Sequence, residues 1–94
     1  MDRLDAMTSF VRAVESGSFV AAARSLGLSA PMIGNHVRFL EARLGGSLLV
    51  RTTRTQSLTD LGRAYYTRCR AILADLEEAE ALSGDNAIMP RGLL

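Results

Sequence analysis

The chain has 94 residues, of which 48% are apolar and 22% charged, and its formal net charge is +1. This length allows one small domain, and the composition is that of a globular protein and not of a disordered one. No stretch is apolar enough to cross a membrane and the acidic start is unlike a secretory signal, so we expect a cytoplasmic protein without membrane contact. The single cysteine, Cys69, cannot form an internal disulfide, which agrees with a reducing compartment.

The charges are unevenly distributed along the chain. Residues 71–94 are acidic, whereas residues 20–70 hold only Glu41 and Asp60 against a set of arginines. These arginines are Arg24, Arg38, Arg43, Arg51, Arg54, Arg63, Arg68 and Arg70. A basic block of planar guanidinium groups suits contacts to phosphates and base edges.

The first half of the chain predicts three helices. Asp2 caps a first helix that ends at Gly17, and Ser18 caps a short second helix that runs into Gly27. The apolar residues of the first helix share one face: Leu4, Met7, Phe10, Val11 and Val14. A third helix covers residues 29–44, from Ser29 as its cap to a stop at two glycines. Its inner stripe is Ile33, Val37, Leu40 and Leu44, and its outer face carries Pro31, Asn35, Arg38 and Ala42, with Met32 and Phe39 on the flank.

The second and third predicted helices have the spacing of a helix-turn-helix. Ala23 lets the two helices approach, Gly27 takes the turn, and Leu28 and Ile33 fill the angle between them. In this arrangement the outer face of the second helix of the pair enters the major groove of DNA.

The outer face of the third helix offers chemistry for reading bases. Pro31 and Met32 would contact thymine methyl groups, Asn35 would bind adenine through its amide, and Arg38 would reach a phosphate or a guanine. The alternative is a partly exposed core helix whose polar residues are merely solvated. His36 lies beside the inner stripe, so we expect a structural role first and a phosphate contact second.

The remaining residues predict a hairpin and a long last helix. Residues 47–51 form a strand in which Leu48 and Val50 alternate, residues 52–55 a turn, and residues 56–58 a return strand. Thr59 with Asp60 caps a helix from about 60 to 82. Its apolar stripe has coiled-coil spacing: Leu61, Tyr65, Cys69, Ile72, Leu76 and Ala79.

This narrow stripe favours pairing with a partner helix, which makes it a candidate dimerisation surface. The residues assigned to dimerisation are Tyr65, Cys69, Ile72, Leu73, Leu76 and Ala79. In the alternative, the first two turns pack on the chain's own domain through Leu61 and Tyr65. Cys69 is expected to be a buried apolar residue of the stripe and not a redox switch.

A series of spaced motifs extends from Ala22 to Gly62. They are Ala22-Ala23, Leu26, Ser29, Leu40-Glu41, Leu44-Gly45, Leu48-Leu49, Arg51-Thr52, Arg54 and Leu58-Thr59 with Gly62. This series resembles the DNA-binding domain of LysR-type transcriptional regulators, and the resemblance covers residues 2 to about 82. Gly34 and Asn35 depart from it, because the family usually has Ser followed by Arg or Lys there.

The resemblance implies a mainly α fold. Residues 1–58 would form a winged helix-turn-helix with a two-stranded wing, residues 59–82 a long linker and dimerisation helix, and residues 83–94 a flexible linker and the start of a missing effector-binding domain. The implied function is sequence-specific binding of double-stranded DNA as a homodimer. Recognition helices 29–44 would lie in major grooves, and the wings near Arg54 in adjacent minor grooves. The DNA-contact residues would be Ser29, Ala30, Pro31, Met32, Asn35, His36, Arg38, Arg51, Thr52, Thr53 and Arg54.

Further partners follow from the same resemblance. The full-length protein could assemble as a tetramer and contact RNA polymerase, and a small-molecule inducer would bind the absent effector domain, with no cofactor in this fragment. We do not expect an enzyme, because the sequence lacks the residues of the catalytic sites considered. Cys69 and His36 are too few for a zinc site, and residues 27–31 lack the final glycine of a nucleophile elbow. The remaining alternative is a winged-helix adaptor domain that contacts another protein.

Overall fold

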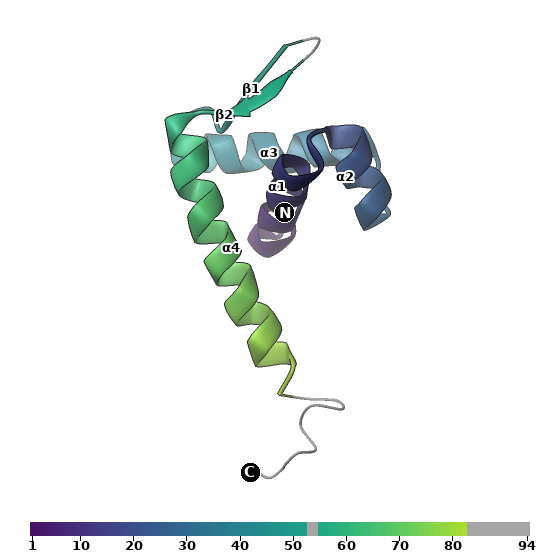
Figure 1. The fold of residues 1–94 in the computed structure, drawn as a ribbon, viewed down its shortest axis with the longest axis vertical. Helices are drawn as coiled ribbons and strands as arrows, with labels where there is room; N and C mark the ends of the chain where they lie inside the picture. The colour runs from purple at the N-terminus through teal and green to yellow at the C-terminus, as the bar shows by residue number, and fades with distance from the viewer. Residues whose placement is uncertain (53–54, 83–94) are drawn as a thin grey trace.

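The computed structural model describes residues 1–52 and 55–82, in which it contains four helices and one two-stranded antiparallel sheet. In chain order the elements are α1 (Arg3–Ser16), α2 (Phe19–Leu26), α3 (Ala30–Leu44), β1 (Leu49–Arg51), β2 (Gln56–Leu58) and α4 (Asp60–Glu80). The first three helices pack together, the β1–β2 hairpin projects from them as a wing, and α4 runs away from the wing (Figure 1). The predicted winged helix-turn-helix with a long last helix is therefore confirmed.

Side-chain caps begin all four helices at the predicted residues. Each cap accepts a hydrogen bond from a backbone N–H two or three residues later: Asp2 from Leu4, Ser18 from Ala21, Ser29 from Met32 and Thr59 from Gly62. Gly27, which separates α2 from α3, has a φ of 71°, in the left-handed region that other residues rarely adopt. The turn of the helix-turn-helix therefore depends on a glycine at this position.

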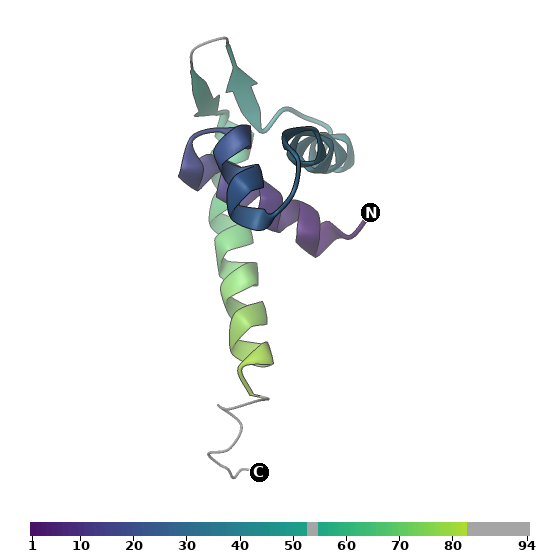
Figure 2. The same cartoon turned by 90° about the vertical axis from the view of Figure 1, so that its right-hand side faces the viewer.

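The core is built around α1, which contacts α2, α3 and α4 (Figure 2). The predicted inner stripe of α3 is confirmed for Ile33, Val37 and Leu40, all of which are buried. It is wrong for Leu44, which is 40% exposed because α3 ends there. The prediction that Leu28 fills the angle between α2 and α3 is also wrong, since this residue follows the left-handed Gly27 and remains 38% exposed.

The wing begins two residues later than the sequence pattern indicates, at Leu49. β1 pairs with β2 in the register Leu49 with Leu58, Val50 with Ser57 and Arg51 with Gln56. The expected alternation of Leu48 and Val50 on one face is wrong, because Leu48 is fully buried and Val50 is 52% exposed. Leu48 precedes the strand, and its carbonyl accepts a hydrogen bond from the backbone N–H of Thr59. This bond ties the base of the wing to the start of α4.

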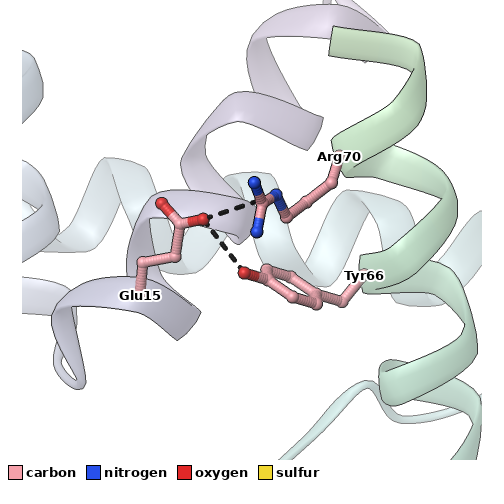
Figure 3. Close-up of polar contacts among 3 residues, drawn as sticks. All are labelled: Glu15, Tyr66 and Arg70. Atoms are coloured by element: carbon pink, nitrogen blue, oxygen red, sulfur yellow. Dashed lines mark hydrogen bonds and ion pairs between the residues drawn. The ribbon is translucent and has the colours of Figure 1, made fainter. Parts of the chain in front are cut away.

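A small polar cluster joins the end of α1 to the middle of α4 (Figure 3). The Tyr66 hydroxyl donates a hydrogen bond of 2.9 Å to Oε2 of Glu15, and Nε of Arg70 lies 3.8 Å from the same oxygen. Next to this cluster, toward the core, the Phe10 ring contacts the rings of Tyr65 and Tyr66, with ring centroids 5.8 Å and 6.5 Å apart. The first half of α4 is therefore part of the domain core.

The predicted dimerisation stripe of α4 is divided between two environments. It is wrong for Cys69, which is fully buried within this chain, because α1 covers that side of the helix. Tyr65 and Leu73 are partly buried and also pack against the core. For Tyr65 this is the alternative stated above, in which the first turns of the helix pack on the chain's own domain. Ile72, in contrast, is 45% exposed. Leu76 is half-buried and Ala79 is exposed, so the part of the stripe from Ile72 to Ala79 is available to a partner.

Burial of Cys69 makes fold stability sensitive to alkaline pH. Desolvation raises the pKa of the thiol from 9.0 to about 11, and it also raises the pKa of Tyr65. Between pH 9 and 11 the unfolded chain loses the thiol proton while the folded chain keeps it, so the free energy of unfolding should fall by up to about 3 kcal/mol. Urea unfolding at several pH values measures this fall. In Cys69→Ala the free energy of unfolding should change less between pH 9 and 11 than in the wild type. The same pH dependence in both proteins would contradict this explanation.

Candidate nucleic-acid interface

The outer face of α3 is exposed to solvent at four of the residues predicted to read DNA. Pro31, Met32, Asn35 and Arg38 all lie on it, and Ser29 precedes them as the exposed cap. Ala30 differs, because it is half-buried and packs against the core. The structure thus brings an apolar pair and a polar pair together on one face of α3.

The polar pair of this face is directly bonded. Nη2 of Arg38 donates a hydrogen bond of 2.5 Å to Oδ1 of Asn35, one turn of helix away. The neighbouring Gly34 is buried, and its α-carbon packs beside the guanidinium of Arg38 and the ring of Phe19. Sequence reasoning treated Asn35 and Arg38 as independent contacts, although their spacing of three residues is the signal of a possible pair.

His36 faces inward and belongs to the fold. Its imidazole is buried, and Nδ1 lies 2.5 Å from the Ser9 hydroxyl oxygen of α1. This contact satisfies two buried polar groups at once and supports the structural role that the sequence favoured. The second choice, a phosphate contact by His36, is contradicted by this burial.

The wing adds a second basic group next to α3. The guanidinium carbon of Arg51 lies 3.8 Å from the centroid of the Phe19 ring, a cation–π contact that holds the exposed arginine beside the start of α2. Phe19 was not predicted to take part, and its only sequence signal is an aromatic residue directly after a helix cap. Thr52 belongs to the wing tip and bonds to Thr55, whereas Thr53 and Arg54 lie outside the described residues.

The last turns of α4 carry acidic side chains and lie far from the wing. The wing with Arg51 lies at one end of the molecule, and the acidic last turns of α4 extend toward the other (Figure 1). The exposed acidic residues of those turns are Asp75, Glu77, Glu78 and Glu80. An anionic ligand is therefore favoured at the end that carries α3 and the wing.

Other kinds of site are not found in the described part of the chain. Within residues 1–52 and 55–82, no group of three or more His, Cys, Asp or Glu residues could hold a metal ion. Over the same residues, no helix combines the length and apolar character that a membrane span needs.

Helix-turn-helix, wing and exposed polar helix face together define a winged regulatory domain of the DNA-binding class. A family model described as bacterial regulatory helix-turn-helix protein, lysR family, matches residues 4–63. The chain belongs to this LysR family of transcription regulators, which confirms the resemblance seen in the sequence and the prediction that it is not an enzyme.

Relatives and solved structures agree with this assignment. The chain is 49% identical over 85 residues to an HTH-type transcriptional regulator of Xanthomonas campestris, and 44% identical over 94 residues to a transcriptional repressor of Pseudomonas aeruginosa. These matches cover 90% and 100% of the chain but 25% and 30% of the relatives. The chain therefore spans less than a third of the length of these relatives.

Two solved structures of DNA-binding domains are similar to the chain. The CbnR domain in complex with DNA has a TM-score of 0.78 and 34% identity, covering 85% of this chain and 91% of that one. The BenM domain in complex with catB site 1 DNA has a TM-score of 0.81 and 29% identity, covering 87% and 91%. Both similarities extend over nearly the whole winged domain.

Proposed function

We propose that this chain binds double-stranded DNA sequence-specifically, as the DNA-binding domain of a LysR-type transcriptional regulator. The observation that carries the proposal is the exposed outer face of α3, where Pro31, Met32, Asn35 and Arg38 lie together above a buried inner stripe. The CbnR and BenM domains, which share the fold, were solved with DNA bound. In this function α3 lies in the major groove.

Individual contacts can be assigned from the geometry of the exposed groups. Pro31 and Met32 would contact thymine methyl groups, and Ser29 and Arg51 would bind phosphates on either side of the groove. The minor-groove contact of Arg54 and the phosphate contacts of Thr52 and Thr53 remain predictions from the sequence.

We also propose that two chains form a homodimer through the exposed part of α4. A groove of about 540 Å³ runs between α1, α3 and α4, and its lining includes the exposed Leu4, Leu44 and Ile72. Arg3 and Arg43 also line the groove, which makes it complementary to the acidic last turns of α4 in a second, antiparallel copy. Two recognition helices would then meet successive major grooves.

The whole regulator would have further partners, which the family resemblance predicts. These are a tetrameric assembly, RNA polymerase in the cytoplasm and a small-molecule inducer bound by an effector domain. Each remains a prediction for the longer protein.

DNA binding should depend steeply on salt, and Arg51 should carry part of this dependence. Because each neutralised phosphate releases counterions, Arg51→Ala should reduce the slope of log affinity against log salt by about one unit per bound chain. Fluorescence anisotropy with a labelled duplex between low and moderate salt measures both slopes. Arg70→Ala is the matched control, because Arg70 of α4 already pairs with Glu15 of α1, so its loss should leave the slope unchanged.

The same titration separates DNA binding from the adaptor alternative. An affinity for duplex DNA that does not change with salt, or no binding at any salt, would contradict the proposed function and favour a domain that contacts protein.

A further inference from the structure

The Asn35–Arg38 pair determines which atoms of Asn35 face outward. A guanidinium carries only N–H donors, so the amide atom that it contacts at 2.5 Å must be the oxygen Oδ1. One acceptor site of Oδ1 is then occupied, and Nδ2 stays unpaired as a donor among the described residues. Both residues are exposed, and the guanidinium and Nδ2 place neighbouring donors beside the engaged Oδ1 on the outer face of α3.

Gly34 lies beside this arrangement and adds no side chain to it. A Cβ atom at residue 34 would lie 3.4 Å from Nη1 and 3.7 Å from Nη2 of Arg38, and 3.7 Å from Cε2 of Phe19. These are ordinary van der Waals distances, so the guanidinium packs directly over the backbone of residue 34. Arg38 thus folds back along the helix toward Asn35 without obstruction.

We propose that Arg38 orients the Asn35 amide so that the pair reads guanine, and not adenine, at one base pair of each half-site. The inference rests on the proposed DNA-binding function. Guanine presents two acceptors, N7 and O6, in the major groove, which match two neighbouring donors from Nδ2 and the guanidinium. Adenine presents an amino donor beside N7, and the guanidinium places a like donor where that amino group must bind. The pairing thus replaces the adenine preference expected from Asn35 alone.

Selection of bound duplexes from a random pool, with the 94-residue chain and its variants, tests the inference. Asn35→Ala identifies the base pair in question as the one whose preference it removes. Wild type should select guanine there, and Arg38→Met should change the preference to adenine by about tenfold, since the freed Oδ1 can accept from the adenine amino group.

Arg24→Met is the matched control, since this exposed arginine lies on α2 and makes no contact with Asn35 in the structure. It should leave the preference at that base pair unchanged. Adenine selected by wild type, or guanine retained in Arg38→Met, would overturn the inference. The proposed function has its own readout, because salt-dependent binding of the wild type to duplex DNA stays measurable whichever base is preferred.

Discussion

Gly62→Ala should destabilise the fold by about 3 kcal/mol or more, which corresponds to a fall in melting temperature of roughly 12 °C or more for a domain of this size. A Cβ at residue 62 would lie 2.0 Å from the carbonyl oxygen of Leu48 and 2.9 Å from its carbonyl carbon. Both are backbone atoms at the base of the wing, and the Thr59 N–H also bonds to that carbonyl. The first turn of α4 would have to separate from the wing. Thermal unfolding followed by circular dichroism measures the loss.

Gly46→Ala provides the matched control for this substitution. The added Cβ would lie 2.9 Å from Leu61, but the contacted atom is the end of a flexible and partly exposed side chain that can rotate away. We expect a change below about 1 kcal/mol. Equal melting temperatures for Gly62→Ala and wild type would show that the wing and α4 do not pack as closely as described.

Ile72→Asp should convert the proposed dimer into monomers. The substitution would remove the side chain that lies beside Leu4 and Leu44 and bury a carboxylate on both sides of the two-fold interface. Arg3 and Arg43 offset only part of the desolvation of this charge, so we expect a cost of about 3 kcal/mol or more. The dissociation constant should therefore rise at least about a hundredfold. Sedimentation equilibrium of the 94-residue chain at micromolar concentration, with and without duplex DNA, measures the association.

Ala71→Asp adds the same charge to the neighbouring position of α4. Residue 71 is exposed and lies about 100° around the helix from Ile72, away from the groove lined by Leu4 and Leu44. This variant should dimerise like the wild type. A wild-type chain that stays monomeric at high micromolar concentration, both free and on DNA, would contradict the proposed interface.

The helices could be predicted from the sequence because their signals are local. Each cap residue bonds within three positions of itself, so Asp2, Ser18, Ser29 and Thr59 mark helix starts without knowledge of the fold. The start of the wing could not be predicted in this way. Thr59 donates hydrogen bonds to the carbonyl oxygens of residues 47 and 48, and the strand begins only after them, at Leu49. These bonds join residues far apart in the chain, so no local pattern indicates them.

The stripe on α4 shows a second limit of sequence patterns. Apolar spacing along a helix identifies a buried face but not the surface that covers it. Here α1 covers Cys69, while Ile72 stays exposed on the same helix. The stacking of Arg51 on Phe19 could not be predicted from the sequence either, because the two residues are far apart in the chain and no sequence pattern links them.

The alternation of buried and exposed residues along α3 has a consequence for how such regulators diverge. Ile33, Val37 and Leu40 maintain the core, whereas Met32 and Asn35 point outward and contribute little to it. Substitutions at the outward positions can therefore accumulate after gene duplication without loss of the folded state. A new operator preference is accessible by single steps from a stable parent, so descendants of one domain can come to control different sets of genes.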